Sequence, residues 1–246
     1  MEQIRNIHKK SKGTYGSPRI TEELKVNYVH ASRPRVARIM QKANIRSITK
    51  KRFVATTDSK HTFPVSPNLL NRKFKVDLQS KVWISDITYI RTLEGWLYLT
   101  IIMDLADRKI IGWALSSSMH ASTTIIPAWR MAIQNRPFRG KLLFHSDRGV
   151  QYACTEFREL LLKSQIVTQS MSRKGNCWDN AVAESFFKTL KTECVYRNKY
   201  VSRKQASVSV FEYIETWYNT QRRHSSLNYL SPNEYGELLN KQKIAA

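Results

Sequence analysis

The sequence predicts an α/β protein in which a mixed β-sheet is covered by helices on both faces, with a small helical module before it and a helical extension after it. Three observations lead to this prediction. Three strand-like apolar runs follow one another at hairpin spacing, and helical and strand-like segments then alternate. In addition, the first 60 residues carry 15 Lys and Arg against 4 Asp and Glu. This quarter of the chain holds half of the net charge and is therefore expected to form a unit of its own.

Residues 1–54 are interpreted as a basic helix-turn-helix-like module that binds DNA. One helix is expected from Ser17-Pro18 to about Val26, and a second from Ser32 with Pro34, because Pro suits the first turn of a helix. Two short helices joined by a turn fit a DNA groove. A basic hairpin that packs on protein fits as well, because no base-reading code is visible. In both cases phosphate contacts are expected from Arg19, Arg33, Arg35 and Arg38.

The other elements follow in order. Residues 55–76 lack a helical period and contain two prolines, so we interpret them as a linker before a core at 77–200. The expected strands are 81–90, 96–104, 110–115, 141–146 and 166–168. The expected helices are 122–135, 155–164, a segment that Asp179 opens, and 205–220. This last helix belongs to a C-terminal helical extension at 201–246, and it is followed by a polar run at 221–224 and a tail closed by Ser231-Pro232.

Composition restricts the class of partner. The 246 residues include 41 Lys and Arg against 19 Asp and Glu, which gives a net charge of +22 and a pI near 10.1. Such a balance indicates a polyanion, and nucleic acid first of all. There is no apolar run long enough for a membrane span and no signal peptide, so we expect a cytoplasmic protein that does not bind membranes. Three Cys without a CxxC pair exclude a disulfide framework and a Cys-based zinc finger.

Three carboxylates on three separate elements are candidates for one site. Asp86 lies inside a strand, where a buried and unpaired charge would cost several kcal/mol, so a cation is expected beside it. Asp147 follows another strand, at a place where side chains emerge at the carboxyl edge of a sheet. Glu184 lies on the next helix. Carboxylate oxygens suit Mg²⁺ or Mn²⁺, and two such ions serve phosphodiester chemistry.

The helix that carries Glu184 also carries two lysines. At about 100° per residue, Glu184, Lys188 and Lys191 fall within roughly 60° of one another, apart from the apolar face, so all three are expected to look outward. The lysines would then lie where a DNA backbone passes. Asp179 is expected to cap the helix. The plainer interpretation is a Glu-Lys pair on an exposed helix, worth about 0.2–0.5 kcal/mol.

Alternatives remain open for these residues. Asp104 and Asp107 are alternatives to Asp86 as the strand carboxylate of the site. Each acid could instead be a turn residue or half of a salt bridge, so spacing alone does not identify the site residues. A second group of polar residues is predicted to bind DNA or support the site: Asn180, Arg222, Arg223 and His224. For these the alternatives are that Asn180 completes the helix cap and that the Arg pair solvates a helix end.

Several motifs together carry a family resemblance. They run in order from residue 15 to residue 235, and lie at 15–20, 83–89, 145–152, 170–181, 184–187 and 218–232. By these motifs the whole chain resembles the B-frame protein of transposases of the IS-three insertion-sequence family, which are relatives of retroviral integrases.

The resemblance implies the fold and the site. The core is expected to be ribonuclease H-like, with a mixed five-stranded sheet, and Asp86, Asp147 and Glu184 to be the DDE triad that binds two Mg²⁺ or Mn²⁺ ions. Lys191 is the basic residue seven positions past the Glu. In the family about thirty-five residues separate the second Asp from the Glu, whereas 36 separate them here, in a connection near 166–169 that can absorb one more.

The resemblance also implies the activity: a DNA transposase, that is a polynucleotidyl transferase, that cleaves insertion-sequence ends and joins them by attack of a 3′-hydroxyl. The expected partners are double-stranded DNA, an A-frame protein joined by frameshifted fusion, and further copies of the chain on DNA, in the bacterial cytoplasm near the nucleoid. One rival interpretation is a catalytically idle B-frame protein that binds DNA or regulates through the A-frame partner. Another is a nuclease on the same core.

Overall fold

The computed structural model of the protein describes residues 1–48 and 63–244, and its centre is a five-stranded sheet in the order β3-β2-β1-β4-β5. The first three strands, β1 (Val82–Thr92), β2 (Gly95–Asp104) and β3 (Ile110–Ser116), form an antiparallel meander. The last two, β4 (Leu142–Ser146) and β5 (Val167–Met171), run parallel to β1. The predicted mixed sheet is confirmed.

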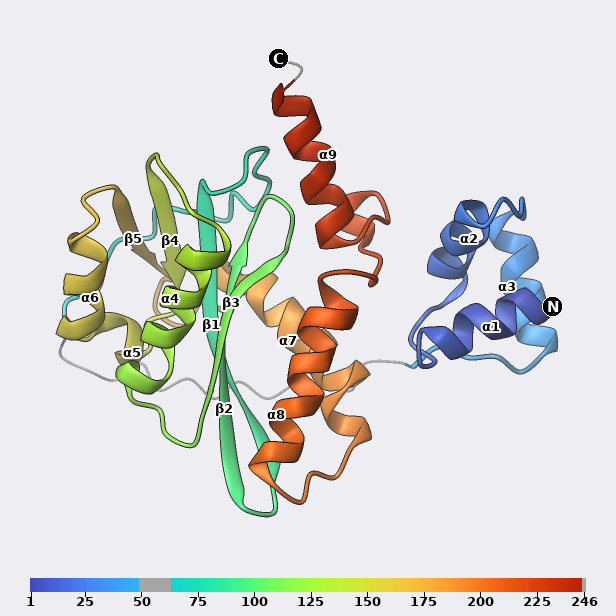
Figure 1. Ribbon diagram of the computed structural model, residues 1–246, viewed down its shortest axis with the longest axis horizontal. Coiled ribbons are helices and arrows are strands. Elements are labelled where there is room, and N and C mark those ends of the chain that lie inside the picture. Colours follow the sequence, from blue (N-terminus) through green and yellow to red (C-terminus); the bar gives the residue numbers. More distant parts are fainter. Residues whose placement is uncertain (49–62, 245–246) are drawn as a thin grey trace.

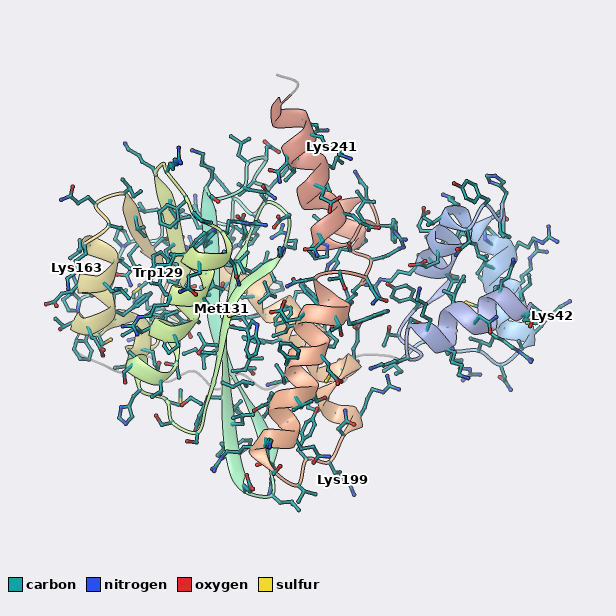
Figure 2. All side chains as sticks on the ribbon, viewed as in Figure 1. Lys42, Trp129, Met131, Lys163, Lys199 and Lys241 are labelled. Atoms are coloured by element: carbon teal, nitrogen blue, oxygen red, sulfur yellow. The ribbon has the colours of Figure 1, made fainter. Side chains whose placement is uncertain are left out.

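One face of the sheet is covered by α4 (Ile125–Asn135), α5 (Val150–Ala153) and α6 (Thr155–Leu162), which lie together in the left half of Figure 1. A short 3₁₀ turn, η1 (Ala121–Thr123), leads into α4. Aromatic side chains fill the space between these helices and the strands, and Trp83 packs edge-on against Trp129 at 5.5 Å between ring centroids. Figure 2 shows Trp129 among the side chains of this layer, whereas lysines such as Lys163 project from the outside.

The other face is covered by α7 (Ala181–Glu193) and α8 (Arg203–Phe211), which continues as a π-helical segment, η4 (Glu212–Tyr218). Two 3₁₀ turns flank α7, η2 (Cys177–Asn180) before it and η3 (Val195–Arg197) after it. The apolar side of α7 packs on β1 and β2, and the core here includes Ile84, Leu99, Ile101, Phe186, Phe187, Leu190 and Ile214. Helices on both faces of the sheet were predicted, and this is confirmed.

The N-terminal module consists of α1 (Glu2–Lys10), α2 (Ser17–Val26) and α3 (Arg33–Lys42). Its small core contains Ile4, Tyr15, Ile20, Leu24, Val36 and Met40. The side chain of Ser32 caps α3 by accepting a hydrogen bond from the Arg35 amide. Helix α1 was not predicted, because its sequence is mostly polar and only Ile4 is buried.

The C-terminal extension ends in a helix that was not specified in the sequence prediction. After the turn η5 (Ser225–Leu227), helix α9 runs from Pro232 to Ile244. It begins with a capping box, because the Ser231 amide donates to the Glu234 carboxylate at 2.7 Å and the Glu234 amide donates back to Ser231 Oγ at 3.3 Å. Serine followed three residues later by glutamate is a helix-start signal that the sequence carried.

The predicted linker 55–76 falls partly outside the described residues, at 55–62. From 63 to 76 the chain forms neither helix nor strand and lies against the core. Leu70 is buried under the sheet, and the amides of Leu69 and Leu70 donate to Ser170 Oγ. Within the described ranges, no helix is both long enough and apolar enough to cross a membrane.

Candidate active site

The strand register brings Asp86 and Asp147 to neighbouring positions. Strand β1 pairs in parallel with β4, and Ile84 lies opposite His145 in that pairing. Each aspartate lies two residues further along, and adjacent strands are about 4.8 Å apart. Because side chains alternate between the faces of a strand, Asp86 lies on the same face as Ile84, which packs in the core beneath α7. Both aspartates therefore meet at the edge of the sheet that α7 approaches.

Glu184 comes to the same edge because α7 begins against β1. Asn180 precedes the helix, and its side-chain Nδ2 donates to the Ser85 carbonyl oxygen at 3.1 Å, next to Asp86. Glu184 lies in the first turn of α7. Neither Asp179 nor Asn180 forms a side-chain cap at this helix, so the predicted Asp179 cap is wrong, as is the idea that Asn180 completes it.

The three carboxylates influence one another. Protein surrounds most of the Asp86 carboxylate, and this burial, together with the charges of Asp147 and Glu184, holds the pKa of Asp86 well above its usual value. Burial and then the charge of Asp147 raise the pKa of Glu184. Among residues 1–48 and 63–244, however, no three His, Cys, Asp or Glu side chains are grouped closely enough to hold a metal ion. The acids are thus electrostatically coupled without forming a closed metal site.

Backbone amides hold the two aspartates, and a buried tyrosine lies behind them. The Ile87 amide donates to Asp86 Oδ1 and the Gly149 amide to Asp147 Oδ1, both at 2.9 Å. Behind them, the buried Tyr152 hydroxyl lies 2.9 Å from Ser85 Oγ, and its pKa is raised well above the usual value by burial and by the charges of Asp147 and Asp86. We did not single out Tyr152 or Gly149 from the sequence, although both follow Asp147 within five residues.

The two lysines of α7 are not equivalent. Lys188 is exposed, as predicted, whereas Lys191 is only 6% exposed, so the prediction that it looks outward is wrong. Its ammonium lies 5.0 Å from the centroid of the Tyr89 ring. Burial lowers the pKa of Lys191, and its charge in turn lowers that of Asp86. Lys191 is therefore the cation expected beside the buried strand carboxylate.

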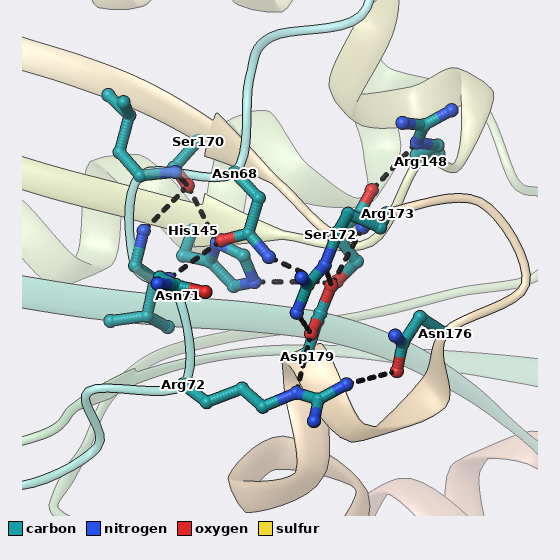
Figure 3. A network of polar contacts seen from close by, with 12 residues as sticks. Asn68, Asn71, Arg72, His145, Arg148, Ser170, Ser172, Arg173, Asn176 and Asp179 are labelled. Atoms are coloured by element: carbon teal, nitrogen blue, oxygen red, sulfur yellow. Dashed lines mark hydrogen bonds and ion pairs between the residues drawn. The ribbon is translucent and has the colours of Figure 1, made fainter.

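A network around Asp179 fixes the approach to α7 (Figure 3). The Asp179 carboxylate is fully buried and receives Nε and Nη2 of Arg173 at 2.8 and 2.7 Å, Arg72 Nε at 2.9 Å and Asn68 Nδ2 at 2.8 Å. Arg72 also donates to the Asn176 side chain at 2.8 Å. The chain before the sheet is thereby tied to the loop before α7, and this fixes where Glu184 enters the site.

His145 lies beside this network of polar contacts (Figure 3). Its Nδ1 lies 2.8 Å from Ser170 Oγ and its Nε2 3.3 Å from Ser172 Oγ. Burial lowers the pKa of His145 to about 4, so the ring is neutral at pH 7. Arg148 Nε donates to the Ser172 carbonyl oxygen at 2.7 Å, which joins the loop that carries Asp147 to the end of β5.

Asp104 and Asp107, the sequence rivals of Asp86, form a separate structural cluster. Both are fully buried, and Arg136 bridges them with contacts of 2.7–3.0 Å. Asp104 also accepts hydrogen bonds from the Ser80 amide and from Trp83 Nε1. Their oxygens are occupied by donors that anchor the β2–β3 turn, so this cluster stabilises the fold.

The residues predicted to bind DNA divide into two groups. Arg33, Arg35 and Arg38 are exposed on α3, as is Lys188 on α7. The inward-facing group consists of Arg19, Asn180, Lys191, Arg222, Arg223 and His224.

Ion pairs hold two of the inward-facing residues in place. Arg222 pairs with Glu193 at 2.7 Å, and Arg223 pairs with Glu23 at 2.7 Å. Because both guanidinium groups are buried, the alternative that the Arg pair only solvates a helix end is wrong.

Comparison with known proteins decides the family. A family model described as an integrase core domain matches residues 78–177, a second with the same description matches 165–232, and an HTH-like domain matches 1–53. The chain is 41% identical over 235 residues to an uncharacterized 31 kDa protein of insertion element IS600 from Shigella sonnei, which covers 96% of this chain and 86% of that protein. It is 39% identical over 226 residues to transposase InsF of insertion sequence IS3A from Escherichia coli strain K12, covering 92% and 78%. The chain belongs to the IS3 (IS-three) family of transposases.

The fold of this IS3-family transposase is also found among viral integrases. A chain of the cryo-EM structure of the simian T-cell lymphotropic virus intasome in complex with PP2A regulatory subunit B56 gamma aligns with a TM-score of 0.51 at 16% identity. The alignment covers 90% of this transposase and 70% of that chain. The predicted ribonuclease H-like core, the N-terminal helix-turn-helix-like domain and the transposase function agree with these matches, and both domain types imply DNA binding.

Proposed function

We propose that Asp86, Asp147 and Glu184 are the catalytic metal-binding residues of this transposase, and that the chain cleaves and joins insertion-sequence DNA ends. One observation carries the proposal: Asp147 at the end of β4 and Glu184 on α7 lie near enough to Asp86 on β1 that their charges add to burial in raising the pKa of Asp86. A protein that only binds DNA gains nothing from gathering negative charge beside a basic surface, since the repulsion costs stability. This favours catalysis over the idle regulatory alternative.

The donor set fits a hard divalent cation. Carboxylate oxygens are the ligands that Mg²⁺ and Mn²⁺ prefer. The three acids repel one another, and a bound divalent cation would offset this repulsion. When bound, two such ions would activate the attacking oxygen and stabilise the leaving oxygen of a phosphodiester. Glu184 makes no hydrogen bond or ion pair within the described part of the chain, so rotation about its side-chain bonds is available to bring its carboxylate to the aspartates.

The remaining residues of the site orient these three. The Ile87 and Gly149 amides each hold one carboxylate oxygen, which fixes the direction of the other. Lys191 offsets part of the negative charge from the buried side. Lys188 is exposed one turn beyond Glu184, where it contacts the phosphate backbone of incoming DNA.

The substrate we propose is double-stranded DNA, both as element ends and as target. The exposed arginines Arg33, Arg35 and Arg38 on α3 would bind its phosphates. End-specific binding is assigned to the form fused with the A-frame protein, which would bring its own DNA-binding elements, and to assembly of several copies on DNA.

A strand-joining assay tests the proposal. Purified chain is incubated with pre-cleaved labelled ends, target plasmid and Mg²⁺, and covalent joint molecules are counted. Asp147→Asn should reduce joining to background with DNA binding and melting temperature nearly unchanged, whereas Asp77→Asn, an exposed acid before β1, should join like the wild type. EDTA should stop joining, and added Mg²⁺ or Mn²⁺ should restore it. Joining that survives Asp147→Asn would refute the assignment, and DNA nicking without joint molecules would identify a nuclease.

A further inference from the structure

A cavity with both basic and apolar lining residues, among the latter Met103 and Phe186, lies on the face of α7 next to the one that carries Glu184. Its volume is about 350 Å³ and it is enclosed by α7, by the residues around Tyr218 at the end of η4, and by the segment that follows. Basic groups from distant parts of the chain line it: Arg19, Arg108, Arg222 and His224. Hydroxyl groups of Ser185, Thr189, Ser225 and Ser226 complete the wall.

Two of the basic side chains have buried nitrogen atoms without a partner. In the part of the chain that the structure describes, neither Arg108 Nη1 nor His224 Nε2 has a hydrogen-bond partner, although both atoms are shielded from solvent. The other terminal nitrogen of Arg108 donates to the Phe74 carbonyl oxygen at 2.8 Å, which fixes the guanidinium group. The His224 ring is 9% exposed and stands edge-on to Tyr218 at 4.8 Å. A buried polar atom left unpaired costs about 1–3 kcal/mol, so these atoms indicate a missing ligand.

The cavity also holds positive charge without a direct ion pair among the described residues: Glu193 acts on Arg19, and Asp104 and Asp107 act on Arg108, only from a distance. Arg222 is neutralised because its Nε and Nη2 both donate to Glu193. Arg19 and Arg108 form no ion pair with any described residue, and Arg19 Nε donates only to the Arg223 carbonyl oxygen, at 3.0 Å. Burial, followed by the charge of Arg222, lowers the pKa of both Arg19 and His224. An anion in the cavity would relieve this charge, and guanidinium groups with nearby hydroxyls suit phosphate oxygens.

The position of the cavity indicates which phosphate it would hold. Ser185 directly follows Glu184 and is exposed, so the cavity opens on the surface that carries the acidic site and Lys188. We propose that this cavity binds one backbone phosphate of the DNA substrate and thereby sets the distance between the duplex and the three carboxylates. The inference rests on the proposed function in so far as DNA is the substrate.

Two exposed positions provide a matched test. Ser226→Asp places a negative charge in the wall of the cavity, and Asn228→Asp adds the same charge two residues away, outside the wall, at a left-handed backbone position that Asp tolerates. Inorganic phosphate is titrated into the full chain at constant ionic strength, and the His224 imidazole signals are followed by NMR. We expect saturable shifts in the wild type and in Asn228→Asp, and at least about tenfold weaker phosphate binding in Ser226→Asp.

A second experiment, with a DNA duplex, distinguishes a site for a DNA backbone phosphate from a site for free phosphate. A short duplex should shift the same His224 signals and compete with inorganic phosphate, and Ser226→Asp should reduce the slope of log affinity for that duplex against log salt by roughly one. Any of three results would overturn the inference. The duplex could compete with phosphate while Ser226→Asp leaves the salt slope unchanged, Ser226→Asp and Asn228→Asp could bind phosphate equally well, or the His224 signals could show no saturable shift. Phosphate binding without competition from DNA would identify a site for free anions and reject the backbone assignment. Because Asp147→Asn should bind phosphate like the wild type, failure of this inference is distinguishable from failure of the catalytic assignment.

Discussion

Gly149 controls how closely the chain packs around the carboxylate of Asp147. Its amide holds Asp147 Oδ1, and a Cβ added to it would lie 3.0 Å from that oxygen and 3.0 Å from Gln151 Oε1. The backbone of Gly149, at φ −57° and ψ 143°, suits any residue, so the restriction comes from the crowded side chains and not from the conformation.

Gly149→Ala should therefore displace the Asp147 carboxylate without unfolding the protein. We expect the Mg²⁺ concentration for half-maximal strand joining to rise roughly tenfold, which is the usual scale for a change behind a metal ligand. Gly140→Ala is the control, because its added Cβ would meet only Lys81 Nζ, at an ordinary 3.5 Å. Equal Mg²⁺ requirements in the two variants, measured by titration of the joining assay, would show that Asp147 needs no such positioning.

At the scale of single residues, the sequence pointed to the carboxylates as candidates but not to the residues that surround them. Asp86 and Asp147 were candidates because one lies inside an apolar strand and the other directly follows one, and their catalytic role stays a prediction. Tyr152 and Arg108 could not, because a tyrosine after a strand or an arginine in a tight turn has no distinctive pattern until the sheet brings it beside Ser85 or beside His224. The depth of Lys191 was missed because helix geometry predicts a direction around the axis and not what covers it.

At the scale of elements, the end of α7 is fixed by a buried ion pair. Glu193 accepts two hydrogen bonds from Arg222, at 2.8 and 2.7 Å, and one from the Tyr213 hydroxyl at 2.9 Å. Burial alone would raise the pKa of Glu193, but the charge and hydrogen bonds of Arg222 outweigh it and hold the pKa below its usual value. The pair joins α7 to the chain that follows η4.

Glu193→Gln should lower the free energy of unfolding at pH 7 by about 3 kcal/mol, because Arg222 is left buried without its counter-charge. A carboxylate with a lowered folded-state pKa contributes stability that is complete above its unfolded-state pKa of about 4.3 and is lost as the pH falls through the folded-state value. The difference between wild type and variant, measured by urea unfolding, should therefore shrink below about pH 4. Glu22→Gln breaks only an exposed pair with Lys25 and should cost about 0.3 kcal/mol at pH 7. A Glu193 effect as small as that of Glu22 would contradict the assignment.

Elements with strong apolar patterns were predicted well. The meander, β4, β5 and helices α2, α3, α4, α6 and α8 follow from runs of buried residues with strand or helix periods. Helices α1, α5 and α9 were missed because α5 is a single turn and the other two are mostly polar. Asp179 was misread as a cap because its five hydrogen-bond donors come from residues far apart in the chain or across a loop.

At the scale of the whole molecule, the N-terminal module is docked on the C-terminal extension, on the side of α8 away from the sheet (Figure 1). Arg223 is the centre of this contact. Its Nε pairs with Glu23 of α2 at 2.7 Å, its Nη1 donates to the Tyr229 carbonyl oxygen, and its amide donates to the Tyr15 hydroxyl at 2.8 Å. The Tyr15 ring lies 5.7 Å from that of Trp217. Because Arg19 of α2 also lines the proposed phosphate cavity, this docking completes the cavity wall.

Glu23→Lys should release the N-terminal module, because it replaces the nearer of the two counter-ions of the buried Arg223 guanidinium, the other being Glu234 at 3.8 Å, with a second positive charge. Such a change costs several kcal/mol. We expect the radius of gyration from small-angle X-ray scattering to rise and phosphate binding at the cavity to weaken as Arg19 moves away. Glu22→Lys changes the net charge equally at the adjacent position, whose only ion pair in the described chain is the exposed one with Lys25, so it should leave both measurements unchanged. If the two variants scatter alike, the pairing of Glu23 with Arg223 does not hold the module in place, and the Tyr15–Trp217 contact becomes the element to vary.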